Sequence, residues 1–325
     1  MAFVEASKLK KYFPVQKSFI AQLVSRQTEY VRAVDEIDLS VMRGDVYGLV
    51  GESGSGKTTI GRLTAALSKP TAGRIIVGGT DPFAGGKMKE FRRRVQMIYQ
   101  DPLSSLNPKM KVGDAIGEPL RYLAKKGSRE RRLAVERLLE IVGLSPASTF
   151  YDRYPQELSG GQRQRVVIAR ALISQPEYVV ADEPVAMVDV SVRAQIMDLL
   201  LRMQSDLKLT VLMITHDLAV AKYMCNRISV MYLGKIAETG DNEQIFSNPL
   251  HPYTKALMAA VPIPNPRART EKNVPTGEIP SALNPPSGCR FHPRCPYAFD
   301  RCRVEEPKLL EREPRHFVSC HLYEK

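Results

Sequence analysis

The chain has 325 residues, of which 43% are hydrophobic and 25% charged, and its formal net charge is +12. These proportions indicate an ordinary globular protein with two domains, or one large domain with an appendage, and no apolar run approaches the ~20 residues of a membrane-spanning helix or forms a secretory signal. The positive charge suits polyphosphates, nucleic acids or anionic lipids, but the two dense basic clusters, 90–95 and 128–133, lack interleaved aromatics, so nucleic acid binding is not expected.

The first chemical signal is GESGSGKT (51–58), which matches the phosphate-loop pattern G-x-x-x-x-G-K-[ST]. Apolar residues 46–50 predict a buried strand before it, and residues 57–67 continue with helical spacing. Glycines let backbone N–H groups converge on a phosphate at the N-terminus of the helix. We expect Lys57 to reach the β- and γ-phosphates and Thr58 to bind Mg²⁺. The predicted nucleoside-triphosphate site comprises Gly51, Ser53, Gly54, Ser55, Gly56, Lys57, Thr58 and Thr59.

A helical region and a second anion site follow. Residues 111–144 show helical spacing, with Leu133, Leu138, Leu139 and Val142 expected on one side. In ELSGGQRQRVVIARAL (157–172), Ser159 stands in N-cap position, and Gly160 and Gly161 would expose amides at the positive end of the next helix. Because the two anion sites belong to separate helices, we do not expect them to hold the same phosphate within one monomer.

Two apolar runs end in polar residues that suit the same reaction. EYVVADEP (177–184) predicts a buried strand that delivers Asp182 as a Mg²⁺ ligand and Glu183 as a general base. LTVLMITHD (209–217) predicts another strand that brings His216 to the same sheet edge, within reach of a γ-phosphate. Strand and helix patterns alternate over 176–240, which indicates a parallel sheet.

The end of the chain is rich in proline and cysteine. Residues 262–288 read as an irregular linker, and four of the five cysteines follow it at Cys289, Cys295, Cys302 and Cys320. Their spacing lacks the paired C-x2-C of common zinc ribbons, but four thiolates suit either Zn²⁺ or an iron–sulfur cluster. A mixed Cys/His zinc site is also possible, because three histidines lie nearby: His292, His316 and His321. The remaining alternative is that the four thiols are free and buried.

Leu158–Gln162 resemble the signature of ATP-binding-cassette (ABC) ATPases. Three further stretches resemble the ATPase subunits of oligopeptide and dipeptide importers, and the likeness covers nearly the whole chain: 99–120, 154–172 and 248–262. The resemblance implies an α/β fold, with a RecA-like parallel sheet, an antiparallel β lobe and a helical subdomain at about 111–172. These would form a nucleotide-binding domain over 1–261, followed by a small irregular Cys-rich module over 262–325.

The resemblance also implies roles for single residues. In a head-to-tail dimer, the phosphate loop of one subunit and the signature of the other would enclose one ATP, with Ser159, Gly160, Gly161 and Gln162 in the signature and Asp189 at the seam. The residues before Asp189 are alanine, methionine and valine, where the family usually has serine, alanine and leucine. Gln100 would contact Mg²⁺ and water. Tyr12 is expected to stack on adenine, with Phe13 and Tyr30 as alternatives.

The implied partners are a second and different ATPase chain, two permease chains and an external substrate-binding protein, at the cytoplasmic face of a membrane. The stretch after Gln100 would receive the permease. Resemblance favours a [4Fe–4S] cluster over Zn²⁺ for the tail cysteines. Oligosaccharide and nickel importers share these features, so the cargo stays open. A stand-alone ABC ATPase acting on nucleic acid or ribosomes is the alternative, although the chain has one phosphate loop, one signature and no sustained heptad run.

Overall fold

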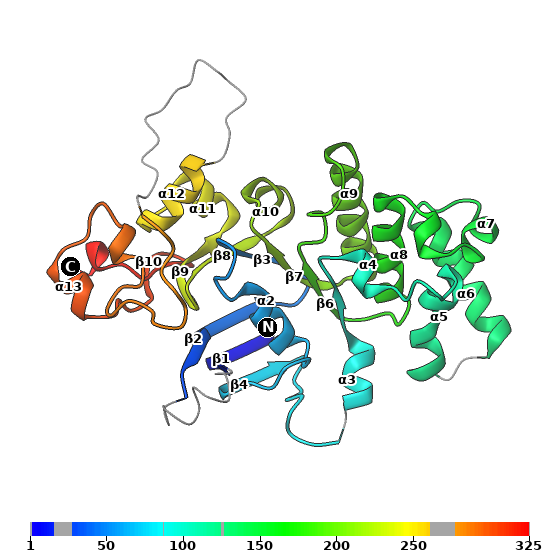
Figure 1. The fold of residues 1–325 in the computed structure, drawn as a ribbon, viewed down its shortest axis with the longest axis horizontal. Coiled ribbons are helices and arrows are strands. Elements are labelled where there is room, and N and C mark those ends of the chain that lie inside the picture. Colours follow the sequence, from blue (N-terminus) through cyan, green and yellow to red (C-terminus); the bar gives the residue numbers. More distant parts are fainter. Residues whose placement is uncertain (1, 16–27, 87, 125–126, 261–276, 325) are drawn as a thin grey trace, which may run out of the picture.

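A computed structural model describes residues 2–15, 28–86, 88–124, 127–260 and 277–324 (Figure 1). Its centre is an eight-stranded mixed sheet. The strands lie in the order β10 (Leu310–Glu313), β11 (His316–Val318), β9 (Lys235–Asp241), β8 (Arg227–Tyr232), β3 (Val46–Val50), β7 (Thr210–Thr215), β6 (Tyr178–Asp182) and β5 (Val95–Ile98).

The predicted parallel sheet is confirmed for the five strands from β8 to β5, whereas β9 returns antiparallel to β8. Every residue of β3, β6 and β7 is buried, as expected for parallel strands covered on both faces. Side chains alternate between two cores: Val46 and Val50 face one, while Tyr47 and Leu49 face the other. The sheet is therefore a two-sided platform whose carboxyl edge carries the loops.

One face of the platform is covered by a smaller antiparallel sheet in the order β2 (Tyr30–Met42), β1 (Ala2–Pro14) and β4 (Ala72–Val77). Helix α2 (Lys57–Thr64) lies between the two sheets and buries Ile60 and Leu63 in their shared core. The helix is shorter than the predicted 57–67. On the opposite face, α9 (Val190–Leu207) and α10 (Leu218–Met224) contribute to the other core.

A group of helices stands beside the sheet, on the right in Figure 1. As predicted, Leu139 and Val142 are buried, but Leu133 is 61% exposed and its predicted place on the packed side is wrong. Val135 fills that side instead, because it lies four residues before Leu139 and so on the same helical face. The group comprises α4 (Pro102–Ser105), α5 (Val112–Tyr122), α6 (Ser128–Ile141), α7 (Ala147–Tyr151) and α8 (Gly160–Leu172).

Among the described helices, none is long and apolar enough to cross a membrane. The remaining helices are α3 (Met88–Arg94), α11 (Asn242–Ser247), α12 (Pro252–Ala260) and α13 (Asp300–Val304). Of the predicted linker, 262–276 lies outside the described residues, and 277–288 contains neither helix nor strand, as predicted.

The tail is less irregular than predicted, because its hairpin β10–β11 extends the central sheet. Phe317 and Val318 pair with Thr239 and Glu238 of β9. Sequence alone gives no sign of this pairing, since β10 and β11 are only four and three residues long. The tail and the central platform are thus joined through one continuous sheet.

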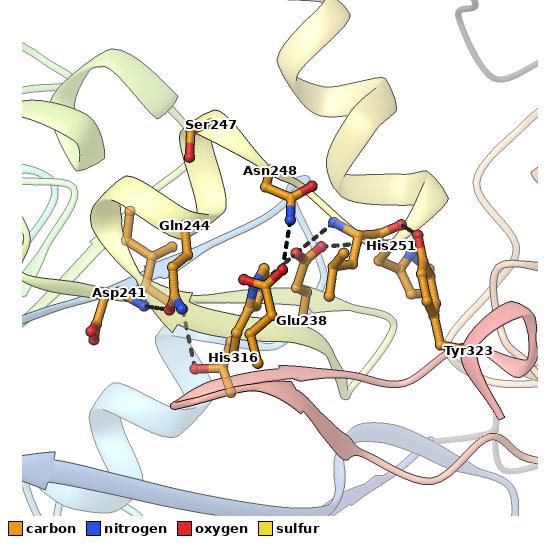
Figure 2. Close-up of polar contacts among 12 residues, drawn as sticks. Glu238, Asp241, Gln244, Ser247, Asn248, His251, His316 and Tyr323 are labelled. Atoms are coloured by element: carbon orange, nitrogen blue, oxygen red, sulfur yellow. Dashed lines mark hydrogen bonds and ion pairs between the residues drawn. The ribbon is translucent and has the colours of Figure 1, made fainter. Parts of the chain in front are cut away.

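A buried carboxylate fastens this junction (Figure 2). Glu238 accepts the N–H groups of Leu250 and His251 and contacts Nε2 of His316, all at 2.8 Å. Burial lowers the pKa of His316, but the carboxylates of Glu238 and Glu313 have the larger combined effect, and the net result is a raised His316 pKa. Burial lowers the pKa of His251 to about 4, so that ring stays neutral. Glu238 therefore joins β9, the start of α12 and β11.

Candidate functional site

The glycine-rich loop between β3 and α2 has the backbone that the phosphate-loop pattern requires. Gly51 and Gly56 have φ values of 152° and 106°. A Cβ at Gly51 would lie 2.1 Å from the Met231 carbonyl oxygen, and one at Gly56 would lie 2.0 Å from that of Ala33. Neither position tolerates a side chain, which keeps the loop backbone close to its neighbours and its N–H groups free of covering side chains. Ser53 and Gly54 are exposed at the tip of the loop.

Lys57 lies inside this loop. Its ammonium group donates to the carbonyl oxygens of Gly51 and Glu52, each at 2.8 Å, and to the Ser55 hydroxyl at 3.3 Å. Burial lowers the pKa of Lys57, although the nearby carboxylates of Glu183 and Asp182 oppose that shift. The loop therefore encloses a positive charge whose hydrogen-bond partners are oxygen atoms, and a phosphate would supply further oxygen acceptors for it.

Two carboxylates end β6 beside the loop. Asp182 accepts the Thr58 hydroxyl at 3.0 Å, and burial raises its pKa, which the Thr58 hydrogen bond opposes. A bound cation would favour the charged form of Asp182 and so oppose the effect of burial. Thr58 and Asp182 present hard oxygen atoms of the kind that Mg²⁺ prefers. The predicted ligand pair is therefore together in space, 124 residues apart in sequence.

Glu183 lies at the centre of the predicted catalytic group. Its Oε2 accepts the Gln100 amide at 2.9 Å, and its Oε1 contacts His216 Nδ1 at 2.9 Å. The Glu183 backbone has a φ of 47°, a strained conformation for a side chain of this size. Its N–H is bonded to Ile214 O of the neighbouring strand at 2.8 Å, which helps to hold that conformation. The three predicted side chains thus converge at the end of β5, β6 and β7.

The signature segment begins a helix as predicted. Ser159 is the N-cap of α8: its hydroxyl accepts the Gln162 N–H at 3.3 Å, and the Gln162 side chain accepts the Ser159 N–H at 3.0 Å. The N–H groups at the first positions of the helix, Gly160 and Gly161, have no partner within the helix. Helix α8 belongs to the helical group, whereas α2 lies between the sheets (Figure 1). The two positive helix ends therefore belong to different layers of one chain.

Of the residues expected at the signature and the dimer seam, Ser159 and Asp189 are exposed, Gly160 and Gln162 are half-buried, and Gly161 is buried. Asp189 precedes α9 without capping it through its side chain. Met187 on one side of Asp189 is 59% exposed, and Val190 on the other is 78% exposed. The three N-terminal aromatics differ in their surroundings: Phe13 and Tyr30 are exposed, while the Tyr12 hydroxyl is bonded to Asp35. That hydrogen bond fixes the orientation of the Tyr12 ring.

The four tail cysteines are all free thiols. Burial is the main reason that the pKa of Cys289 rises to about 12 and that of Cys320 to about 11, and the other tail thiols add to the shift. Backbone N–H groups two residues further on hydrogen-bond three of the sulfurs: those of Phe291, Tyr297 and Leu322 to Cys289, Cys295 and Cys320 respectively.

The side chains do not support the predicted metal site. Within the described part of the chain, no group of three or more His, Cys, Asp or Glu side chains is placed to hold a metal ion. The histidines considered for a mixed zinc site have other partners, because His316 binds Glu238 and His321 binds Glu324 and the Glu305 carbonyl. His292 contacts the Cys289 carbonyl oxygen.

Sequence analysis missed Arg294, which binds the Glu52 side chain within the loop, and Tyr253, whose hydroxyl accepts the Glu52 N–H. Neither residue carries a motif. The only available signal is the position of Arg294 beside Cys295, in a tail that the sequence predicts as a separate module.

Two family models match the chain: one for the ABC transporter over residues 34–186, and one for the C-terminal region of oligopeptide/dipeptide transporters over residues 237–302. A probable peptide ABC transporter ATP-binding protein of Sinorhizobium fredii is 45% identical, over 99% of this chain and 90% of the relative. An oligopeptide transport ATP-binding protein of Bacillus subtilis is also 45% identical, over 98% and 97%.

Solved structures share the fold. A dimeric ATP-binding cassette in a post-hydrolysis state with ADP and phosphate has a TM-score of 0.64 and 26% identity, and the match covers 74% of this chain and 98% of that one. A subunit of an ABC transporter complex from Clostridium perfringens has a TM-score of 0.63 and 26% identity, over 76% and 91%. This chain belongs to the ATP-binding subunits of ABC transporters, in the oligopeptide/dipeptide transporter family.

Proposed function

We propose that this ABC ATPase powers the import of oligopeptides or dipeptides, and that the residues gathered around Glu183 carry out the hydrolysis. The observation that carries the proposal is the placement of Glu183 between Gln100 and His216, beside the loop that encloses Lys57. We infer peptide cargo from the relatives, which match this chain over nearly their whole length and are described as peptide or oligopeptide transport ATP-binding proteins.

The phosphate loop binds the substrate ATP. Lys57 exchanges its carbonyl partners for the β- and γ-phosphates. The backbone amides and hydroxyl groups of the loop complete the cradle, which comprises Gly51, Ser53, Gly54, Ser55, Gly56, Thr58 and Thr59. Mg²⁺, when bound by Thr58, Asp182 and Gln100, neutralises charge on the phosphates. Tyr12 stacks on the adenine.

Hydrolysis then falls to three side chains. Glu183 accepts a proton from the attacking water, because its carboxylate is held at the edge of the loop by a hydrogen bond to each oxygen. His216, which is 58% exposed, turns from Glu183 toward the γ-phosphate when nucleotide is present. Gln100 positions the water and relays the state of the site to the permease.

The complete site needs a second subunit. Ser159, Gly160, Gly161 and Gln162 contact the nucleotide on the partner ATPase, and Asp189 lies at the seam. The exposed Met187 and Val190 on either side of Asp189 supply apolar area to that interface. We propose that the partner is a different chain of the same family, so that the ATPase pair is a heterodimer. ATP closes the pair, and hydrolysis reopens it.

Two permease chains and an external binding protein complete the importer, with this chain peripheral on the cytoplasmic face of the membrane. A groove of about 400 Å³ runs between the end of β5 and α5 and is lined in part by Tyr99, Tyr122 and Leu123. Tyr99, which precedes Gln100 in sequence, and Tyr122 are both exposed there. This groove is a suitable place for the permease to dock, close to the catalytic group.

The proposed cargo is tested in liposomes that contain the ATPase pair and the permeases. We expect binding protein loaded with a peptide to raise ATP turnover, whereas the empty binding protein raises it less. Stimulation by an oligosaccharide or by nickel in place of the peptide would move the chain to another branch of the family. Turnover stimulated by nucleic acid or ribosomes without permeases would instead support the stand-alone ATPase.

We propose that 1–261 form the cassette, and that the four thiols of 262–325 hold a [4Fe–4S] cluster, with Zn²⁺ as the alternative. Burial raises the pKa of Cys289, Cys295 and Cys320, and a backbone N–H near each sulfur partly offsets that shift, as N–H groups do for thiolates in clusters and metal sites. A cluster separates its four thiolates more widely than a single ion does. The cysteines can therefore converge without forming the compact single-ion site that is missing from the described residues.

Metal analysis of anaerobically purified protein tests the cluster. We expect about four irons and four acid-labile sulfides per chain, with a visible absorption band that Cys302→Ser abolishes. A colourless protein with one zinc per chain would replace the cluster by Zn²⁺. A protein free of both metals would leave the tail with free buried thiols and overturn the proposal.

A further inference from the structure

Two arginines of the tail are almost completely buried against the nucleotide-binding lobe. Arg290 and Arg294 are 8% and 9% exposed. Their partners are 255 and 242 residues away in sequence, in β2 and in the phosphate loop. A buried guanidinium group is costly unless it is paired, so its partners indicate its role.

Arg294 binds the side chain of Glu52 in the phosphate loop. Its Nη1 is 2.8 Å from Glu52 Oε2, and its Nη2 is 3.1 Å from Glu52 Oε1. The guanidinium carbon also lies 5.8 Å and 5.9 Å from the ring centres of Tyr232 and Phe291. A two-pronged arginine–carboxylate pair fixes both the position and the orientation of the carboxylate.

Glu52 passes this restraint to Lys57. The Glu52 N–H donates to the Tyr253 hydroxyl at 2.9 Å, and the Glu52 carbonyl oxygen accepts the Lys57 ammonium at 2.8 Å. The same carbonyl oxygen accepts the Ser55 N–H at 3.2 Å. The side chain, amide and carbonyl of Glu52 are all held, so the place of the Lys57 charge depends on a residue that Arg294 orients.

Arg290 acts on the other end of the loop. It donates to the Asp35 carboxylate and to the Leu233 carbonyl oxygen, in the turn between β8 and β9. The next residue, Gly234, donates its N–H to Ser55 O at 2.9 Å and accepts the Asp35 N–H at 2.9 Å. Arg290 therefore holds the turn that holds the loop.

Asp35 extends this contact to the N-terminal strand. Its carboxylate accepts the Tyr12 hydroxyl as well as Arg290. Burial and the bond to Asp35 raise the pKa of Tyr12 to about 12, so the hydroxyl remains a donor at every physiological pH. The proposed adenine-stacking ring is thus oriented through the same tail arginine.

We propose that Arg290 and Arg294 are positioning residues of the ATP site, which act through Glu52, Asp35 and the β8–β9 turn to hold the phosphate loop and Tyr12 in their binding conformation. The inference rests on the proposed function, in which this loop binds ATP. A loop with glycines at 51, 54 and 56 is intrinsically adaptable, and restraint from outside lowers the entropy lost on binding. The tail is then a working part of the nucleotide site.

The test compares Arg294→Lys with Arg301→Lys in the full-length chain. Lysine keeps the charge of Arg294 but cannot form the two-pronged contact. Arg301 makes the same kind of contact with Glu305, at 2.7 Å and 2.9 Å, within the tail and away from the loop, and is the matched control. With mant-ATP and Mg²⁺, we expect Arg294→Lys to weaken binding about tenfold and Arg301→Lys to leave it unchanged.

A coupling measurement separates positioning from mere folding. We expect Glu52→Gln to bind mant-ATP about as weakly as Arg294→Lys. The double variant, which carries both substitutions, should bind no more weakly than either single variant, because each substitution breaks the same Arg294–Glu52 contact. Arg294→Lys, which keeps a positive charge beside Glu52, should melt near the wild-type temperature, whereas Glu52→Gln leaves the buried guanidinium without its carboxylate and should melt lower, so binding is compared well below that transition. Equal losses for Arg294→Lys and Arg301→Lys, or additive losses in the double variant, would overturn the inference. Failure of the wild type itself to bind ATP would refute the proposed function instead.

Discussion

Replacement of Glu183 by glutamine is expected to lower ATP turnover by about 10²–10⁴-fold, the usual contribution of a general base. Glutamine keeps the size of the side chain and can still accept the Gln100 amide, but it cannot take a proton from water. ATP binding does not require that proton, so the closed ATPase pair should accumulate. Steady-state hydrolysis and size-exclusion chromatography with Mg·ATP measure the two effects.

Glu90→Gln makes the same chemical change at an exposed position of α3 and should leave turnover unaltered. Unchanged turnover in Glu183→Gln would remove Glu183 from the role of base. In that case His216, whose Nδ1 contacts the Glu183 carboxylate, would be the next side chain to test.

Replacement of His316 by glutamine should cause the largest loss of stability. The side chains of His316 and Glu238 are both fully buried, and they form an ion pair at 2.8 Å when His316 is protonated. Removing one partner of such a pair leaves a buried charge uncompensated and typically costs about 3–5 kcal/mol. We expect a lower melting temperature and faster proteolysis of the tail, since β11 loses its polar contact with β9 and α12.

The stability of the wild type should also depend on pH through this pair. The folded-state pKa of His316 is raised because the carboxylates of Glu238 and Glu313 outweigh burial. Its stabilising contribution is therefore complete below the unfolded-state pKa of about 6.5 and is lost as pH rises through the higher folded-state value. His251, with a pKa near 4, stays neutral over this range.

Melting curves between pH 6 and pH 9 test this dependence. The wild type should lose stability as pH rises, and His316→Gln should lack that loss. Glu313→Gln is the control, because Glu313 lies 3.6 Å from His316 Nδ1 and its side chain is 45% exposed, so its effect should be much smaller. Parallel pH profiles for the wild type and His316→Gln would show that another group controls the docking of the tail.

Sequence alone predicts the parts of the site that depend on local pattern. The glycines at 51 and 56 identify the loop. Only glycine fits at these positions, because a Cβ atom there would lie 2.1 Å and 2.0 Å, respectively, from a backbone oxygen. Apolar runs before Asp182 and His216 predict buried strands, and parallel strands deliver their carboxyl ends to one edge. Ser159 and Gln162 predict a helix start, and they form a capping box there.

Contacts between distant segments were decided by the tertiary structure. The prediction for α6 placed Leu133 on the packed side, yet that residue is exposed, because the packed face follows Val135, Leu139 and Val142 at intervals of four and three residues. The short strands β10 and β11 form only because β9 offers an open edge, and so carry little pattern of their own. Four thiols in the tail predict a metal or cluster site, but in the described residues no group of three or more His, Cys, Asp or Glu side chains is placed to hold a single metal ion.

The amino-acid sequence thus determined the family, the phosphate loop and the strand ends that carry Asp182, Glu183 and His216, because each depends on residues that lie close together in the chain. The tertiary structure decided that the tail belongs to the nucleotide site. Arg294 and Glu52 are 242 residues apart, and no periodicity or motif relates them. Their pairing follows from the burial of the tail against the loop, where a guanidinium group without a carboxylate would be too costly to keep.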